Sequence, residues 1–183
     1  MRVISGTLKG RKFYPPPKIK ARPTTDLARE ALFNVLIREI NISGIEVLDL
    51  FYGTGSISLE FISRGAKSVI AIDIDIVSKK FLESIVEAWG IKNLRIVKAD
   101  VFKLIKNPNA SFDLVFADPP YADPRFPELP DMILNSGWLR PGGLLILEHN
   151  EEHSYTFHPN FALHKNYGSV NFTFFQLPLE PGK

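Results

Sequence analysis

The sequence predicts an α/β fold: a mostly parallel, seven-stranded sheet covered by helices, with an antiparallel C-terminal hairpin and a small N-terminal extension. From residue 45 onward, short apolar runs bounded by turn residues alternate with segments of helical periodicity. This alternation is typical of a parallel sheet covered on both faces. The segment 161–177 differs, because two apolar runs flank one short turn, which favours an antiparallel hairpin at the edge of the sheet.

The first forty residues, 1–40, are predicted to form the extension, a basic hairpin followed by a helix. Residues 2–14 alternate as two short strands do, with Gly6 and Gly10 near the turn. Three consecutive prolines then impose an extended connector. Thr24 or Thr25 can cap the helix that follows. Its apolar residues recur at helical spacing through about Ile40: Ala28, Ala31, Leu32, Val35 and Leu36.

The remaining residues, 41–183, are predicted to form the main domain. Buried strands are expected at Glu46–Phe51, Ser68–Ile74, Leu94–Lys98, Asp113–Ala117 and Leu144–Glu148. Helices are expected at Ser56–Arg64 and Val77–Trp89. The residues Pro141-Gly142-Gly143 are expected to form the turn before the fifth strand. The final hairpin pairs Phe161–Lys165 with Val170–Leu177.

Composition narrows the function. The chain has no cysteine, which excludes disulfides and thiolate metal sites, and no metal site is expected. It shows neither a signal peptide nor a membrane-spanning run, so we expect a cytoplasmic protein without a membrane partner.

The net charge of +2 is unevenly distributed. Residues 1–22 hold seven basic residues and no acid, whereas the rest hold 15 basic and 20 acidic residues. A basic arm on an acidic body indicates phosphate binding; a solvated N-terminus is the alternative.

A glycine turn after the first predicted strand indicates a nucleoside-containing cofactor. Gly53 and Gly55 allow the backbone to approach a ligand at the carboxyl edge of the sheet, although some such turns serve only as tight turns. Asp73, at the end of the next strand, can accept hydrogen bonds from ribose hydroxyls. Asp49 can help to hold an ammonium group. Ser58 replaces the third glycine of the dinucleotide pattern, so S-adenosylmethionine, which has no pyrophosphate, fits better than NAD.

Three more residues complete the expected cofactor site. Asp100 follows the third strand, where its carboxylate can accept the adenine amino group; the alternative is the cap of a short helix. Val101 or Phe102 is then expected to flank the adenine ring. Tyr52 lies between Asp49 and the glycines and is counted with the cofactor-binding residues.

The tetrapeptide Asp118-Pro119-Pro120-Tyr121 follows the fourth predicted strand and indicates the reaction. An exocyclic amine of a base is a poor nucleophile, because its lone pair is delocalised into the ring. Hydrogen bonds from that amine to the Asp118 carboxylate and the Pro119 carbonyl would direct its lone pair at a methyl group. Tyr121 can stack on a base that has been turned out of its helix or loop. These four residues are the predicted catalytic set, with a structural turn as the alternative.

Together these motifs resemble the class I, Rossmann-like methyltransferases, and more closely the RsmD family. The N-terminal part of this resemblance rests on Arg2–Gly6, Gly10-Arg11, Arg22-Pro23-Thr24, Asp26 and Arg29–Asn34. The resemblance continues through the cofactor and catalytic residues to Leu139–Gly143. It implies an S-adenosylmethionine-dependent enzyme that methylates the N2 amino group of a guanine in small-subunit (16S) ribosomal RNA.

The resemblance also implies the partners of the protein. It suggests ribosomal RNA within the small subunit as substrate and a monomeric enzyme. The expected RNA contacts are Arg11, Lys12, Arg22, Thr24 and Arg29, although Arg29 and Glu30 can instead form structural ion pairs. Two rival functions are methylation of another base, such as adenine N6, and a non-catalytic RNA-binding role in ribosome assembly. Ser58 and the lack of a hydride-transfer site disfavour a dehydrogenase.

Overall fold

The computed structural model describes residues 1–19 and 25–179 and separates into two compact units, residues 1–101 and 102–183. The predicted extension, residues 1–40, lies within the first unit. Arg22 and Thr24, two predicted RNA contacts, lie outside the described residues. Within the described part of the chain, no helix combines the length and the apolar character needed to cross a membrane.

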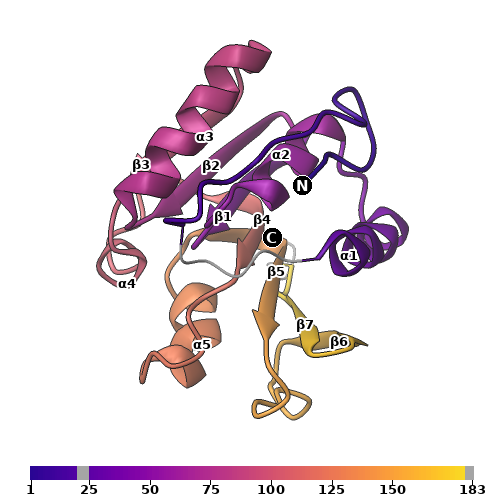
Figure 1. Cartoon of the computed structure of the whole chain (residues 1–183). Helices are drawn as coiled ribbons and strands as arrows, with labels where there is room; N and C mark the ends of the chain where they lie inside the picture. The colour runs from indigo at the N-terminus through magenta and orange to yellow at the C-terminus, as the bar shows by residue number, and fades with distance from the viewer. Residues whose placement is uncertain (20–24, 180–183) are drawn as a thin grey trace. The chain divides into compact units, whose positions relative to one another are not determined.

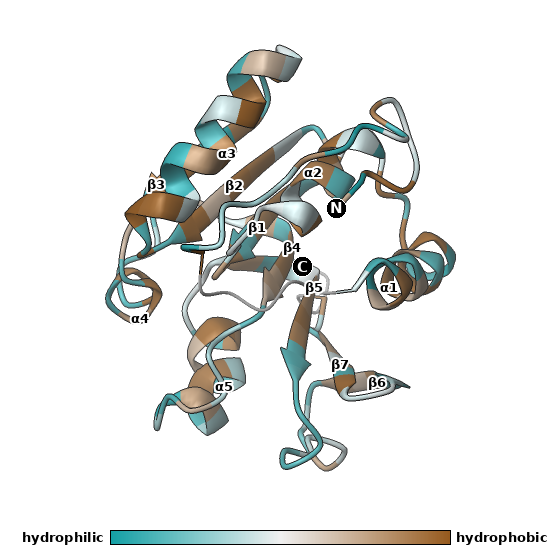
Figure 2. Cartoon of the chain, in the orientation of Figure 1, coloured by the Kyte–Doolittle hydropathy of each residue, from teal (hydrophilic) through white to brown (hydrophobic). Residues whose placement is uncertain are grey.

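The first unit contains three parallel strands in the order β3-β2-β1 (Figure 1). Their bounds are Glu46–Leu50 for β1, Ser68–Asp73 for β2 and Leu94–Lys98 for β3. The helices are α1 Asp26–Glu39, α2 Ser56–Ser63 and α3 Ile76–Trp89, and a short α4, Val101–Leu104, begins at the end of the unit. Apolar and polar residues alternate along α3 (Figure 2), and one face of that helix is buried.

The second unit contains the other four strands, in the order β4-β5-β7-β6. The pair β4, Phe112–Ala117, and β5, Leu139–His149, is parallel. The pairs of β7, Val170–Gln176, with β5 and with β6, Phe161–Tyr167, are antiparallel. A 3-10 helix, Phe126–Glu128, and α5, Leu129–Leu134, connect β4 to β5. The predicted fold class is confirmed: the sheet has seven strands, is mostly parallel and ends in the predicted hairpin.

Two local expectations were wrong. The N-terminal hairpin is reduced to one isolated bridge, Arg2 to Lys12, because the residues between them form turns. The Pro141–Gly143 segment does not precede β5 but lies inside it. There the strand register jumps from the pair Phe112–Leu139 to the pair Leu114–Leu144, so the extra residues are accommodated as a bulge. The sequence also contained no clear signal for α5, which is short and has a proline at its start.

Candidate active site

The turn between β1 and α2 has a tightly constrained backbone. Phe51 adopts φ 61°, a left-handed conformation that costs a non-glycine residue about 1–3 kcal/mol. Gly53 and Gly55 also have positive φ, 53° and 76°. The positive φ of Gly55 favours glycine, and a Cβ there would lie 2.5 Å from Leu82 Cδ1 of α3, so a larger residue would have to displace the Leu82 side chain. The predicted glycine turn is therefore present, and α3 packs directly against it.

Asp73, at the end of β2, is hydrogen-bonded to this turn. One carboxylate oxygen accepts the Gly53 N–H at 2.9 Å, and the other accepts the Asp75 N–H at 2.9 Å. Each carboxylate oxygen has a second lone pair with which it can accept another hydrogen bond. The carboxylate is thus fixed in orientation by the backbone and can still accept ribose hydroxyls.

Asp49 is fully buried and is held by a residue of the next helix. The Ser58 hydroxyl donates a hydrogen bond to its Oδ2, whereas its Oδ1 is buried without a partner. Burial raises the pKa of Asp49 to about 7; the Ser58 hydrogen bond lowers it and the nearby Asp73 raises it. A cationic group beside Oδ1 would relieve this unfavourable burial, as the ammonium of S-adenosylmethionine can.

Ser58 is a site residue that sequence reasoning missed. It was interpreted only as the absence of a third glycine, whereas its hydroxyl orients the Asp49 carboxylate. Its position nine residues after Asp49, in the first turn of the helix that follows the glycines, is the signal that could have indicated this pairing.

Tyr52 offers a second buried polar atom to a ligand. Its side chain is buried, and its hydroxyl has no hydrogen-bond partner. Burial raises the pKa of Tyr52 above its ordinary value, and Asp73 and Asp49 raise it further, so the phenol stays protonated and can donate. The unpartnered atoms of Asp49, in β1, and of Tyr52, in the turn after β1, fit a ligand with polar groups.

Asp100 and Val101 follow β3 at the same edge of the sheet. The Ala99 N–H donates to the Asp73 carbonyl at 3.0 Å, which brings this segment beside the end of β2. Asp100 is half-buried and immediately precedes α4, while Val101 is buried. This placement suits both the adenine contact and the helix cap, so the role of Asp100 stays a prediction.

Two surface hollows of the first unit lie away from the candidate cofactor residues. One, of about 400 Å³, is lined by residues of α3 and β3 between Glu83 and Ile96. Another, of about 510 Å³, is lined by Ile37–Ser43 and Arg64. Neither contains a predicted site residue, so the chemistry of the donor groups, not the size of a hollow, identifies the candidate cofactor site. Among the described residues, no group of three His, Cys, Asp or Glu is arranged to hold a metal ion.

In the second unit, Asp118–Tyr121 directly follows β4, as predicted. Asp118 is half-buried, Pro119 is buried and Pro120 is exposed. The ring of Tyr121 packs edge-to-face on the fully buried Phe126, with 5.6 Å between centroids. The motif therefore occupies a rigid loop at the carboxyl end of a parallel strand, where ligands bind in α/β sheets.

A charged pair closes the turn that follows this motif. Arg125 donates through Nε to Asp123 Oδ1 at 2.9 Å and through Nη2 to Oδ2 at 2.7 Å, and its guanidinium lies 3.7 Å from the centre of the Phe102 ring. Hydrogen bonds from Arg125 lower the pKa of Asp123 to about 2. The Asp123 N–H also donates to the Pro120 carbonyl at 3.0 Å. Sequence reasoning missed this pair.

The predicted RNA contacts have different surroundings. Arg11 and Lys12 are exposed, and the Arg11 guanidinium lies 5.4 Å from the Trp89 ring centre. The prediction that Arg29 contacts RNA needs correction, because its side chain has no exposed surface. Its Nη2 donates to Asp26 Oδ1 at 2.8 Å and to the Arg2 carbonyl at 2.6 Å. The structural ion pair is the alternative that the structure bears out for Arg29.

The chain is similar to known proteins over most of its length. The model of a family described as "Conserved hypothetical protein 95" matches residues 1–176. The Ribosomal RNA small subunit methyltransferase D of Escherichia coli is 31% identical over 167 residues, which are 90% of this chain and 83% of that protein.

Solved structures show the same fold. A putative methyltransferase from Escherichia coli superimposes with a TM-score of 0.85 at 28% identity, over 98% of this chain and 99% of that one. A 16S rRNA N2 methyltransferase of T. thermophilus, in complex with AdoMet and guanosine, has a TM-score of 0.68 at 23% identity, over 88% of this chain and 46% of that one. This second likeness supports the fold alone.

Proposed function

The chain belongs to the family of ribosomal RNA small subunit methyltransferase D, and we propose that it transfers a methyl group from S-adenosylmethionine to the N2 amino group of a guanine in small-subunit ribosomal RNA. The observation that carries this proposal is the position of Asp118–Tyr121. In a chain of this family, the tetrapeptide occupies a rigid loop at the carboxyl end of β4, where a base amine can be bound.

The first unit would bind the cofactor, which supplies an electrophilic methyl group on a sulfonium. Asp49 Oδ1 would pair with its ammonium group, and the Tyr52 hydroxyl would offer a further hydrogen bond. Asp73 would accept ribose hydroxyls with its remaining lone pairs. The strained and glycine-rich turn gives the backbone access to the ligand.

The second unit would orient the target amine. Asp118 and the Pro119 carbonyl would accept its two N–H bonds, which reduces delocalisation of the nitrogen lone pair into the ring. Tyr121, supported by Phe126, would stack on the base. The rate would come mainly from aligned approach and electrostatic complementarity, and the amine proton would leave through Asp118 or to water after the new N–C bond forms.

The partner would be ribosomal RNA, bound through Arg11, Lys12 and the neighbouring basic residues of the arm. We propose the assembled small subunit as substrate and a monomer as the active form. A ribosomal substrate places the enzyme in the cytoplasm. Salt should weaken binding strongly, because phosphate contacts release counterions.

Identification of the methylated nucleoside tests this function. The protein is incubated with labelled S-adenosylmethionine and unmethylated small subunits, free ribosomal RNA or DNA, and the digested nucleosides are separated. N2-methylguanosine from RNA supports the proposal, methyladenine favours the rival base, and no transfer to any of the three substrates favours an assembly protein.

An Asp118→Asn variant tests the catalytic role. It should lose most of the transfer rate while its affinity for S-adenosylmethionine stays within about twofold, because Asp118 contacts the amine and not the cofactor. An Asp131→Asn variant, which changes an exposed carboxylate of α5, serves as the matched control and should be fully active. Loss of cofactor binding in Asp118→Asn would contradict the assigned role.

A further inference from the structure

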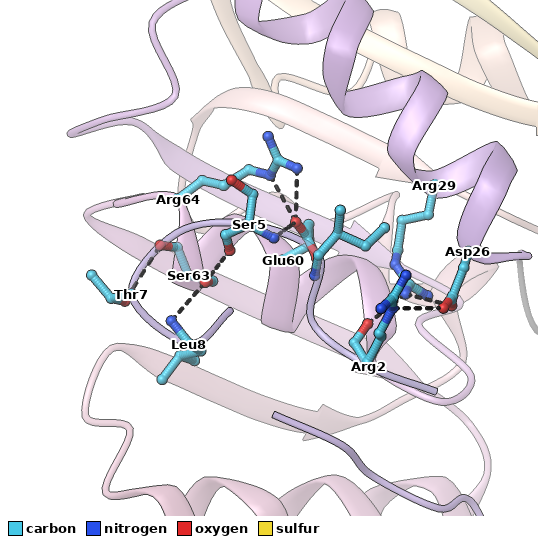
Figure 3. A network of polar contacts seen from close by, with 10 residues as sticks. Arg2, Ser5, Thr7, Leu8, Asp26, Arg29, Glu60, Ser63 and Arg64 are labelled. Carbon is cyan, nitrogen blue, oxygen red and sulfur yellow. Dashed lines mark hydrogen bonds and ion pairs between the residues drawn. The ribbon is translucent and has the colours of Figure 1, made fainter. Parts of the chain in front are cut away.

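Helix α2 contains a buried carboxylate that the proposed chemistry does not use. Glu60 has no exposed surface, and its oxygens accept the backbone N–H of Ile4 at 2.9 Å and of Ser5 at 3.0 Å (Figure 3). Arg64, one turn later, donates to it through Nε and Nη2, both at 2.8 Å. An isolated buried carboxylate is strongly unfavourable, so these partners are required. The N-terminal loop therefore supplies part of the environment that stabilises Glu60.

Ser63 holds the next residues of the same loop (Figure 3). Its hydroxyl accepts the Leu8 N–H at 2.9 Å, and its carbonyl accepts the Thr7 N–H at 2.7 Å. Gly6, between Ser5 and Thr7, has φ 84°, and a Cβ there would lie 1.8 Å from the Ser63 carbonyl oxygen. The backbone of the loop thus lies in direct contact with the backbone of α2, and only glycine at position 6 permits so close an approach.

The chain is anchored again after the loop. Phe13 is buried, with its ring centroid 6.5 Å from that of Phe81 and 6.1 Å from that of Trp89 on α3. Between the two anchors lie three exposed basic residues: Lys9, Arg11 and Lys12. We name this stretch, residues 9–12, the basic turn. Its two ends are fixed to α2 and α3, so the basic turn is preformed.

We propose that Glu60, Ser63 and Gly6 are positioning residues for RNA binding: by seating residues 4–8 on α2, they hold the basic turn in the conformation that contacts RNA phosphates. The inference rests on the proposed function, in which the basic arm binds ribosomal RNA. A preformed basic turn binds without the loss of conformational entropy that a flexible arm incurs. The residues Arg2–Gly6, which resemble a family signature, then position the basic turn and do not recognise the RNA sequence.

The two glycines of the loop provide a matched test. Gly6→Ala and Gly10→Ala both place alanine at a positive φ, 84° and 81°, but only the Gly6 Cβ meets α2, since no atom lies within 4 Å of a Cβ at Gly10. Gly6→Ala should weaken binding of small-subunit ribosomal RNA about tenfold, the effect of ordering one or two loop residues on binding. Gly10→Ala should weaken it by less than about threefold. Affinity for S-adenosylmethionine should be alike in the two variants, whereas the unfolding midpoint should be lower in Gly6→Ala, because buried Glu60 then loses part of its hydrogen bonding.

The salt dependence of binding distinguishes position from charge. Replacing Arg11 or Lys12 by Gln should lower the slope of log affinity against log salt by about 1 for each charge removed. Gly6→Ala should keep the wild-type slope, because all the phosphate contacts form once RNA orders the loop. Amide hydrogen exchange should show faster exchange at Ser5 and Leu8 in Gly6→Ala than in Gly10→Ala. Glu60→Gln should, like Gly6→Ala, speed amide exchange and weaken RNA binding.

The outcomes separate this inference from the proposed function. If Arg11 and Lys12 replacements weaken RNA binding but Gly6→Ala binds like Gly10→Ala, the positioning role is refuted and the function stands. If faster exchange in Gly6→Ala accompanies weaker binding at an unchanged slope, the positioning role is supported. If the wild-type protein binds no ribosomal RNA, the proposed function fails and the inference fails with it.

Discussion

Replacement of Asp49 by Asn should stabilise the ligand-free protein more at high pH than at low pH. In the folded chain the pKa of Asp49 is about 7, against an ordinary value of 3.8, because burial disfavours the charged form. Between these values the folded state retains a proton that the unfolded state has released. The resulting penalty is absent below about pH 4, grows as the pH rises, and is complete above about pH 7.

The magnitude follows from the shift of the pKa. A shift of about three units corresponds to a penalty of roughly 4 kcal/mol, of which about 2 kcal/mol accumulates between pH 5 and pH 7. Asn cannot ionise, so Asp49→Asn lacks this term. Any fixed penalty from its buried amide is the same at both pH values and cancels in the comparison.

Urea unfolding near pH 5 and near pH 8 measures this difference. The free energy of unfolding of Asp49→Asn, relative to wild type, should be about 3 kcal/mol more favourable at the higher pH. Calorimetry with S-adenosylmethionine should show weaker binding, since the amide cannot pair with an ammonium as a carboxylate does. A stability difference that is independent of pH would refute the argument that buried Asp49 is poised near neutrality.

Three further changes test other parts of the structure. Ser58→Ala removes the hydrogen bond that lowers the pKa of Asp49, so cofactor affinity at neutral pH should fall, by calorimetry, and should recover as the pH is raised. Gly55→Ala places a Cβ within 2.5 Å of Leu82 at φ 76°. It should lower the free energy of unfolding by about 2 kcal/mol or more and weaken cofactor binding. Unchanged urea midpoints would contradict the close packing of this turn on Leu82. Arg29→Gln should destabilise the protein by about 2 kcal/mol in thermal unfolding, because it removes the hydrogen bonds of the buried guanidinium to the Arg2 carbonyl and to the half-exposed Asp26. A loss of RNA affinity at unchanged stability would restore Arg29 as an RNA contact.

The strands and the loops that follow them were predictable because their signals are local. A buried strand such as β1 consists of apolar residues next to one another, and the turn after it needs glycines at fixed places. Asp73 was predictable for the same reason, since the order of strands and turns determines which side chains follow a strand end. The prolines after β4 indicated a rigid loop directly.

Longer-range pairings could not be predicted from such signals. Glu60 and Ile4 are 56 positions apart, and only the folded chain brings this carboxylate to that backbone N–H. The bulge within β5 was mistaken for a turn because Gly142 and Gly143 are common in both. Arg29 resembled a surface residue by type, although its guanidinium is buried.

The sequence by itself determined the fold class, the glycine turn with Asp73 and the loop of Asp118, because periodicity, turn chemistry and strand order act over short distances. The tertiary structure alone decided how the charges are placed. Burial gives Asp49 a pKa near 7, and Ser58 donates a hydrogen bond to one of its oxygens. Buried Glu60 accepts backbone N–H groups of the N-terminal loop. The free energy of a charge depends on what surrounds it, and that environment exists only when distant segments pack together.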